Sequence, residues 1–187
     1  MKFEIKAIKT NEKASIARKN LETEYKEELN RILRQLRDGE KFITKQELIK
    51  RFYDWFFANV SYDNDILKMR NNNNSFTSIQ YPYKDCFINC GEKYAPILLN
   101  KGVCQSFSIV FKDFCDLIGV DCKIVRGRDE NVVDLKNEPH MWNEVFLNGK
   151  WSTIDLTPCY KTFMGKLRTQ QNNKFIINDD KSTFERG

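Results

Sequence analysis

Apolar residues recur at steps of three and four in the first part of the chain, between charged residues. Over residues 12–37 this spacing predicts an amphipathic helix that packs on the rest of the protein through one face. The apolar positions are Ile16, Leu21, Tyr25, Leu29, Ile32, Leu33 and Leu36. Gly39 follows the helix and is expected to end it as a left-handed cap.

A second helix is predicted by the signals at its start. Thr44 and Glu47 have the spacing of a capping box, and Ile43 and Leu48 that of the hydrophobic staple around it. The helix continues through LIKRFYDWFFANV, whose many aromatic residues indicate that most of it is buried. The polar segment SYDND then interrupts the pattern.

Residues 68–101 show neither a helical nor a strand period. They contain the run NNNN together with Pro82 and Pro96, and we expect a long irregular stretch. A loop of this length inside a domain is usually functional or mobile, and a low-complexity insertion is the alternative interpretation.

A third helix is predicted to begin at Cys104 and to end at Gly119. Its single apolar face consists of Phe107, Val110, Phe111, Phe114, Leu117 and Ile118. Three strand-like segments follow, at residues 121–128, 141–147 and 151–156. Helices followed by hairpin-connected strands are typical of the α+β class, so we expect helices packed on an antiparallel sheet.

The Asn-Gly dipeptide at residues 148–149 is the strongest hairpin signal in the chain. A two-residue turn there places Trp142 opposite Asp155, and it places His140 on the same face of the ladder as both. His140 is then the diagonal neighbour of Asp155, with the two α-carbons about 7–8 Å apart. The register therefore predicts a hydrogen bond between the imidazole and the carboxylate.

Cys104 stands at the first turn of its predicted helix, where a reactive thiol is expected. Partial positive charge and free N–H groups at a helix start favour a thiolate, and a neighbouring imidazole favours it further. With the pair of His140 and Asp155, this cysteine completes the parts of a Cys-His-Asp triad. The alternatives are a buried structural cysteine and a His-Asp pair that only satisfies two polar groups.

Composition and charge narrow the class of protein. The chain has 187 residues, 41% of them hydrophobic, which suffices for one domain, or for one domain with a helical extension. Its 31 basic and 26 acidic residues are interspersed, which is typical of a solvated surface and not of a nucleic-acid interface. No run is long and apolar enough for a membrane span, and the first residues lack the apolar stretch of a secretory signal, so we expect a cytoplasmic protein.

The six cysteines do not form the pattern of a disulfide scaffold. Cys86 and Cys90 are a Cys-x-x-x-Cys pair, a weak zinc signal because a structural zinc ion takes four ligands. We expect no metal and no cofactor. Cys115, Cys122 and Cys159 are expected to be buried and unreactive.

Three segments in this order resemble the transglutaminase-like superfamily, which belongs with the papain-like cysteine enzymes. They are GVCQSFSIVFKDFCDLIGVDCKIVRG (102–127), HMWNEVFLNGKW (140–151) and STIDLTP (152–158), and FYDWFFANVSYD (52–63) resembles the element that often precedes the nucleophile. The resemblance covers about residues 45–160. It implies a papain/transglutaminase-like core, here a catalytic domain over residues 43–187 after an N-terminal helical extension over residues 1–42.

The resemblance also implies roles for individual residues. Cys104 would be the nucleophile, His140 the general base and then acid, and Asp155 the carboxylate that orients the imidazole. The oxyanion would be met by the backbone N–H of Cys104 and by one side-chain donor, for which Tyr62 is the candidate. Gly102 is expected to permit a close backbone approach before the helix.

Many relatives have Gly-Tyr after the Cys-Gln pair, where this chain has Ser106 and Phe107. We expect the helix to tolerate both residues, because Ser is small and Phe keeps the bulk.

The expected function is acyl transfer from an amide bond through a thioester, with a protein or peptide as substrate. Water as acceptor would make the chain a protease or amidase, which we favour because water is always present. An amine acceptor would make it a protein-glutamine transglutaminase, and an idle triad would leave a binding module. Peptide deglycosylation is disfavoured, because the paired Cys-x-x-Cys motifs of those relatives are absent from the sequence. Nucleic acid and membrane are not expected as partners, and the oligomeric state is left open.

Overall fold

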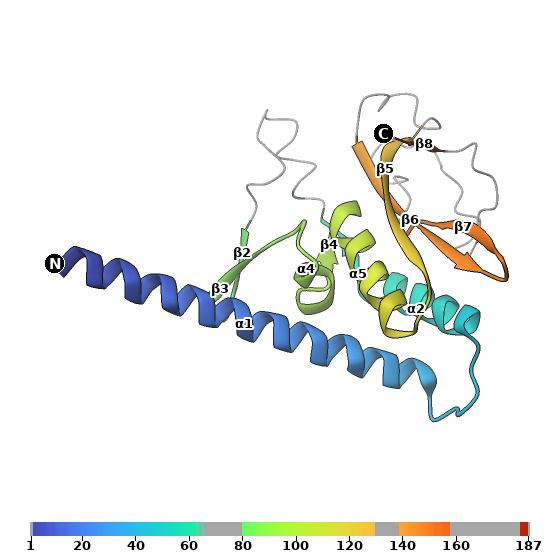
Figure 1. The fold of residues 1–187 in the computed structure, drawn as a ribbon, viewed down its shortest axis with the longest axis horizontal. Helices are drawn as coiled ribbons and strands as arrows, with labels where there is room; N and C mark the ends of the chain where they lie inside the picture. The colour runs from blue at the N-terminus through green and yellow to red at the C-terminus, as the bar shows by residue number, and fades with distance from the viewer. Residues whose placement is uncertain (1, 64, 66–79, 130–138, 158–183, 187) are drawn as a thin grey trace.

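The helices come first along the chain and a four-stranded antiparallel sheet comes last (Figure 1). The computed structural model describes residues 2–63, 65, 80–129, 139–157 and 184–186. Its helices are α1 (Lys2–Arg37), α2 (Lys45–Asn59), α4 (Tyr94–Leu98) and α5 (Cys104–Leu117). Its strands are β1 (Ser61–Tyr62), β2 (Gln80–Tyr83), β3 (Cys86–Asn89), β4 (Lys101–Gly102), β5 (Cys122–Asp129), β6 (Pro139–Leu147), β7 (Lys150–Ile154) and β8 (Phe184–Arg186). The α+β prediction is confirmed.

The sheet has the strand order β7-β6-β5-β8, and α5 packs against β5 and β6. A buried amide ties the helix to the sheet. Asn143 on β6 donates a hydrogen bond of 3.0 Å to the backbone carbonyl of Ser108 on α5, and its side chain is 1% exposed. This bond joins the two elements that carry Cys104 and His140.

Helix α1 packs through the predicted stripe, but it begins ten residues before the predicted start, at Lys2. Five residues of the stripe are buried: Leu21, Tyr25, Leu29, Ile32 and Leu36. Ile16 is 57% exposed, because a step of five residues to Leu21 takes it off this face of the helix. The N-terminal half of α1 extends beyond the other elements (Figure 1). Gly39, at φ 73°, ends the helix in the predicted left-handed conformation.

Helix α2 begins as the capping signals predict. The hydroxyl oxygen of Thr44 accepts a hydrogen bond from the backbone N–H of Glu47 at 3.1 Å, which is one half of the capping box. The carboxylate of Glu47 instead accepts a bond from Arg51 on the next turn. Ile43 packs against the core cluster that contains Leu48, as a staple requires.

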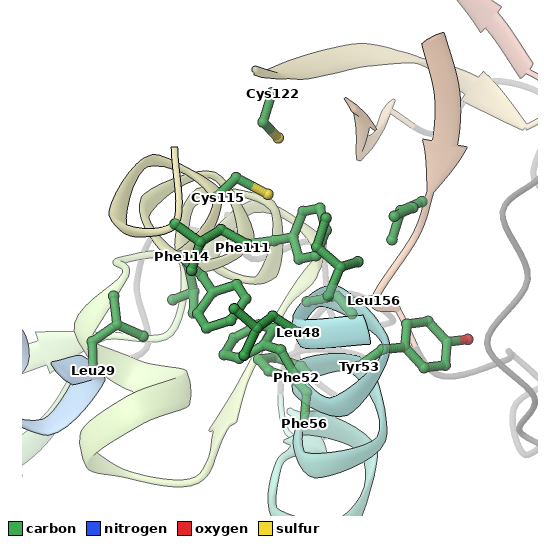
Figure 2. Close-up of a cluster of buried hydrophobic side chains, with 14 of the residues drawn as sticks. Leu29, Leu48, Phe52, Tyr53, Phe56, Phe111, Phe114, Cys115, Cys122 and Leu156 are labelled. Atoms are coloured by element: carbon green, nitrogen blue, oxygen red, sulfur yellow. The ribbon is translucent and has the colours of Figure 1, made fainter. Parts of the chain in front are cut away.

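The core lies between α2 and α5, and aromatic rings dominate it (Figure 2). Phe52 of α2 stacks on Phe114 of α5 with ring centroids 4.0 Å apart. Phe56 meets the edge of Phe107 at 4.9 Å, near the start of α5. These contacts set the position of the helix that begins at Cys104.

The expectation of an irregular stretch over residues 68–101 is wrong for the part that the structure describes. Residues 80–89 form the hairpin β2–β3, residues 94–98 form α4, and residues 101–102 form β4. The local signals are weak, because Pro82 lies inside a strand and the turn contains no Asn-Gly pair. Tertiary contacts stabilise the hairpin instead. The carboxylate of Glu24 on α1 accepts hydrogen bonds from Tyr83 at 2.7 Å and from Lys84 at 2.6 Å. The remaining residues of this stretch, up to 79, lie outside the described residues.

The hairpin β6–β7 has the predicted register. Leu147 pairs with Lys150 and Phe146 with Trp151, across a turn in which Asn148 and Gly149 have φ values of 53° and 80°. Asn and Gly adopt positive φ at little cost in free energy, which explains why this dipeptide fixes the turn.

The prediction of burial is confirmed for two of these cysteines. Cys115 and Cys122 are buried free thiols, and their mutual contact together with burial raises the pKa of Cys115. Figure 2 shows them between α5 and β5. Cys159 lies outside the described residues. Across the described residues, His, Cys, Asp and Glu form no group of three that could hold a metal ion. No helix within these ranges is long and apolar enough to cross a membrane.

Candidate active site

Cys104 is the first residue of α5 and is half-buried. It follows Val103, whose backbone is extended (φ −129°, ψ 173°), so the chain turns into the helix at the thiol. Gly102 has no room for a side chain, because a Cβ atom there would collide with the Ser106 hydroxyl and come within 3.0 Å of Pro96. Gly102 thus permits a close approach, which is made by the side chains of Ser106, Phe107 and Pro96.

Ser106 stabilises the start of this helix. Its buried hydroxyl accepts a hydrogen bond from the Val103 N–H at 3.0 Å and donates one to the Val103 carbonyl at 3.0 Å. The residue just before Cys104 is therefore held by one side chain from the first turn. The helix start also presents N–H groups and partial positive charge to an anion at the thiol.

His140 and Asp155 meet at one end of the β6–β7 hairpin. His140 lies at the start of β6 and Asp155 just after the end of β7, so the antiparallel pairing brings both to the same edge. The His140 Nε2 atom is 2.7 Å from the Asp155 Oδ2 atom. The side chains are 4% and 17% exposed, so this polar contact is well shielded from water.

Thr157 orients the carboxylate of Asp155. Its backbone N–H donates a hydrogen bond of 2.8 Å to the Oδ1 atom, which leaves Oδ2 for the imidazole. Burial alone would raise the pKa of Asp155, but the charge and hydrogen bond of His140, together with Thr157, lower it. The carboxylate is therefore ionised at neutral pH.

The imidazole of His140 contacts both of its predicted partners. Burial lowers its pKa, but the charge and hydrogen bond of Asp155, followed by a hydrogen bond with the Cys104 side chain, raise it to about 10. The structure thus brings the side chain of Cys104 next to the hydrogen-bonded pair of His140 and Asp155.

Trp142 supports the ring of His140 from the same face of β6. The two rings are nearly parallel, with centroids 6.0 Å apart and an angle of 22° between their planes. Trp142 is 2% exposed, so it packs in the interior and limits the rotation of the imidazole.

Tyr62, the candidate oxyanion donor, lies beside the start of α5. It belongs to β1, which pairs in parallel with β4, and its partner is Gly102. Its ring meets the edge of Phe107 at 6.0 Å, and it packs against Val103. The tyrosine is therefore a neighbour of the backbone that leads into Cys104.

The sequence analysis did not identify several residues of this region. Tyr53 on α2 is 4% exposed, and its pKa is raised by burial and by the nearby charge of Asp155. Nothing in its local pattern sets it apart from the other aromatic residues of that helix. Thr157 gave no signal of its own, because the bond to Asp155 uses a backbone N–H that any residue except Pro could supply. Asp63, which is buried and bonded to Tyr81, gave no local signal.

The arrangement is suited to nucleophilic chemistry at an acyl carbon. A thiol at a helix start contacts an imidazole, and a carboxylate fixes the orientation of that imidazole. The imidazole can take the proton of the thiol and later return a proton to a leaving group. Such an acyl transfer involves no oxidation or reduction.

Comparison with known proteins agrees with this picture. The sequence profile of the transglutaminase-like superfamily matches residues 30–156. A search of the curated proteins finds no match.

One of the solved structures that match shows the fold, and another aligns more weakly. A protein described as a TGase aligns with a TM-score of 0.56 and 18% identity, over 80% of this chain and 35% of that chain. A candidate cysteine protease of Cytophaga hutchinsonii aligns with a TM-score of 0.45 and 18% identity, over 69% of this chain and 37% of its own. The chain thus spans little more than a third of the length of these proteins.

Proposed function

Because the chain belongs to the transglutaminase-like superfamily, we propose that it is a cysteine-nucleophile enzyme that cleaves amide bonds through a thioester, as a protease or amidase. The observation that carries this proposal is the position of His140 between the Asp155 carboxylate, 2.7 Å away, and the side chain of Cys104. A histidine that served only to satisfy Asp155 would have no reason to contact a thiol at a helix start.

In the first half of the reaction, the proton of Cys104 resides on His140, whose raised pKa keeps the ring protonated at neutral pH, and the thiolate attacks the carbonyl carbon of the substrate. The carbonyl oxygen becomes an oxyanion in the tetrahedral intermediate. The carbon–nitrogen bond then breaks, the imidazolium gives its proton to the leaving amine, and an S-acyl Cys104 remains. Asp155 stabilises the imidazolium throughout, because its carboxylate stays ionised.

In the second half, His140 takes a proton from water and the resulting hydroxide attacks the thioester. The carbon–sulfur bond breaks, the acid product leaves, and the thiol is restored with the proton from the imidazolium. If a primary amine replaces water, the same steps form a new amide, which is the transglutaminase reaction. We favour water because amine transfer requires an acceptor channel that excludes it.

The oxyanion requires donors that are in place before the reaction. The backbone N–H of Cys104 is one candidate, because the first N–H groups of a helix have no acceptor within it. Tyr62 is the candidate side-chain donor. Its support is its neighbourhood, since it pairs with Gly102 two residues before the thiol.

The choice between hydrolysis and transfer can be tested with a mixture of unfolded proteins, incubated with and without an added primary amine and analysed by mass spectrometry. New peptide termini that appear with the wild type and not with Cys104→Ala would support hydrolysis. Incorporation of the amine at Gln would instead identify a transglutaminase. Cys115→Ala is the matched control, because it removes a buried thiol from the same helix.

A binding module with an idle triad is separated from both by iodoacetamide labelling followed by peptide mapping. Our proposal predicts that Cys104 is alkylated well below pH 8, while the buried Cys115 and Cys122 are not. Labelling of Cys104 only above about pH 8.5, the ordinary thiol value, would contradict the enzymatic proposal.

A further inference from the structure

The hairpin β2–β3 contacts the segment of Tyr62 through a buried carboxylate. Asp63 follows Tyr62 directly, and its side chain is 2% exposed. Its Oδ2 atom accepts a hydrogen bond of 2.7 Å from the hydroxyl of Tyr81 on β2. Its Oδ1 atom accepts one of 3.2 Å from the backbone N–H of Asp65. Burying a carboxylate costs free energy. Its two hydrogen bonds offset this cost and hold the side chain in a fixed orientation.

The backbone of the same segment is tied to the strand that enters the nucleophile helix. The N–H of Asp63 donates a bond of 2.8 Å to the carbonyl of Gly102, and the N–H of Ser61 donates one of 2.9 Å to Asn100. Tyr62 therefore lies between two anchor points on the chain that continues into Cys104. Its main chain is fixed by β4, and the residue after it is fixed by Tyr81.

Side chains of the hairpin also pack near the start of α5. Tyr62 and Tyr81 pack against the same small cluster, formed by Cys90 and Val103. The ammonium of Lys101 lies 3.1 Å from the centroid of the Tyr81 ring, a cation–π contact that holds the ring in place. Burial raises the pKa of Cys90 to about 11, as expected for an enclosed thiol.

We propose that Asp63 and Tyr81 are positioning residues that hold Tyr62 at the site of the developing oxyanion, which makes the hairpin β2–β3 a part of the active site. This inference rests on the proposed function and extends it. Neither residue touches the reacting atoms. Their effect is exerted through Tyr62, so it should appear only in reactions that form an oxyanion.

Two reagents separate oxyanion stabilisation from thiol reactivity. p-Nitrophenyl acetate acylates a thiolate: the sulfur attacks the carbonyl carbon, an oxyanion forms, and the bond to oxygen breaks to release p-nitrophenolate. Iodoacetamide alkylates the same thiolate by displacing iodide at a saturated carbon, and no oxyanion forms. The ratio of the acylation rate to the alkylation rate at Cys104 therefore reports on the oxyanion site alone.

We expect Tyr62→Phe to lower this ratio by about 10²-fold, the usual effect of removing one oxyanion donor. Tyr81→Phe should lower it by about 10-fold, because Tyr62 remains but is held less firmly. Asp63→Asn keeps an acceptor for Tyr81 and should lower the ratio by only about 3-fold. Alkylation alone should change by less than about 2-fold in all three variants, since the pair of Cys104 and His140 is untouched.

The matched control is Tyr83→Phe. Tyr83 lies on the same strand and donates to the carboxylate of Glu24 at 2.7 Å, but this bond leads to α1 and away from the nucleophile. The ratio should be unchanged in this variant. Circular dichroism and thermal unfolding check that each variant is folded, and Asp63→Asn carries the test if Tyr81→Phe does not fold.

Any of the following results would overturn the inference. A normal ratio in Tyr81→Phe, in Asp63→Asn or in Tyr62→Phe would show that these residues do not serve the oxyanion. A parallel fall of both rates, or an equal effect of Tyr83→Phe, would show a general loosening of the hairpin. Failure of the wild type to release p-nitrophenolate in a burst would overturn the proposed function itself.

Discussion

The hairpins β2–β3 and β6–β7 are stabilised in opposite ways. In β6–β7 the turn residues Asn148 and Gly149 adopt positive φ at little cost, so the register is encoded within the hairpin. In β2–β3 the turn places Lys84 at φ 49°, a conformation that costs an ordinary residue about 1 kcal/mol. The contacts that offset this cost come from elsewhere, and they include the hydrogen bonds to Glu24 on α1.

The difference matters because the two hairpins stand at different distances from the candidate catalytic residues. The locally encoded hairpin carries His140 and leads directly into Asp155. The hairpin β2–β3, which depends on tertiary contacts, is linked to Tyr62 through the hydrogen bond between Tyr81 and Asp63. We expect changes in β6–β7 to affect the chemistry directly and changes in β2–β3 to affect it by smaller factors.

The largest effect should follow from His140→Ala. Without the imidazole, Cys104 loses the group that takes its proton, so the acylation rate with p-nitrophenyl acetate should fall by at least about 10³-fold. Alkylation by iodoacetamide should shift to the pH range of an ordinary thiol. Trp151→Phe, on the same hairpin, is the control and should keep most of the wild-type rate.

The next effect concerns the pH dependence of stability. The pKa of His140 is raised to about 10 in the folded protein, so its pairing contributes fully below its ordinary value of 6.5 and is lost as the pH rises toward 10. The free energy of unfolding should therefore fall over this range, at a rate on the order of 1 kcal/mol per pH unit. Urea titrations at several pH values measure it. A slope in Asp155→Asn as steep as that of the wild type would contradict the assignment.

A smaller effect is expected when the turn of β6–β7 is forced out of its favoured conformation. Gly149 has a φ of 80°, so Gly149→Val should lower the free energy of unfolding by about 1–2 kcal/mol. Its Cβ would meet no atom within 4 Å, so the loss would report backbone strain and not a collision. Chemical denaturation measures the change. No loss of stability would show that the turn does not fix the register.

The smallest effect should come from the turn of β2–β3. Lys84→Asn introduces a residue that tolerates positive φ, and the ion pair that it removes involves a lysine whose side chain is 64% exposed. We expect a gain of about 0.5 kcal/mol in the free energy of unfolding, measured by the same titration. A loss would mean that the contact with Glu24 outweighs the strain of the turn.

Much of this molecule could be predicted because its signals are local. The stripe of α1, the cap at Gly39 and the turn at residues 148–149 each depend on neighbours in sequence. The turn then fixes which residues of β6 and β7 share a face, and so predicts the contact of His140 with Asp155. The approach of Cys104 to this pair follows from its place at a helix start together with the family resemblance.

The unpredicted parts depend on partners far away in the chain. The hairpin β2–β3 is held by Glu24, about sixty residues earlier, and no local period announces it. In the sequence, Asp63 resembles any polar residue of a loop. What distinguishes it is its hydrogen bond with Tyr81 in the folded protein. The beginning of α1 at Lys2 has no capping signal that sequence reasoning could use.

The amide of Asn143 has a consequence for the reactive geometry. It lies three residues after His140, and its acceptor Ser108 lies four residues after Cys104. Any slide of the helix along the sheet that would separate sulfur from imidazole must first break the hydrogen bond from Asn143 to Ser108. The cost is about 0.5–1.5 kcal/mol, because the amide keeps longer contacts with the Cys122 sulfur and the Lys123 carbonyl on the sheet. This hydrogen bond thus helps to keep nucleophile and base aligned, although it takes no part in the chemistry.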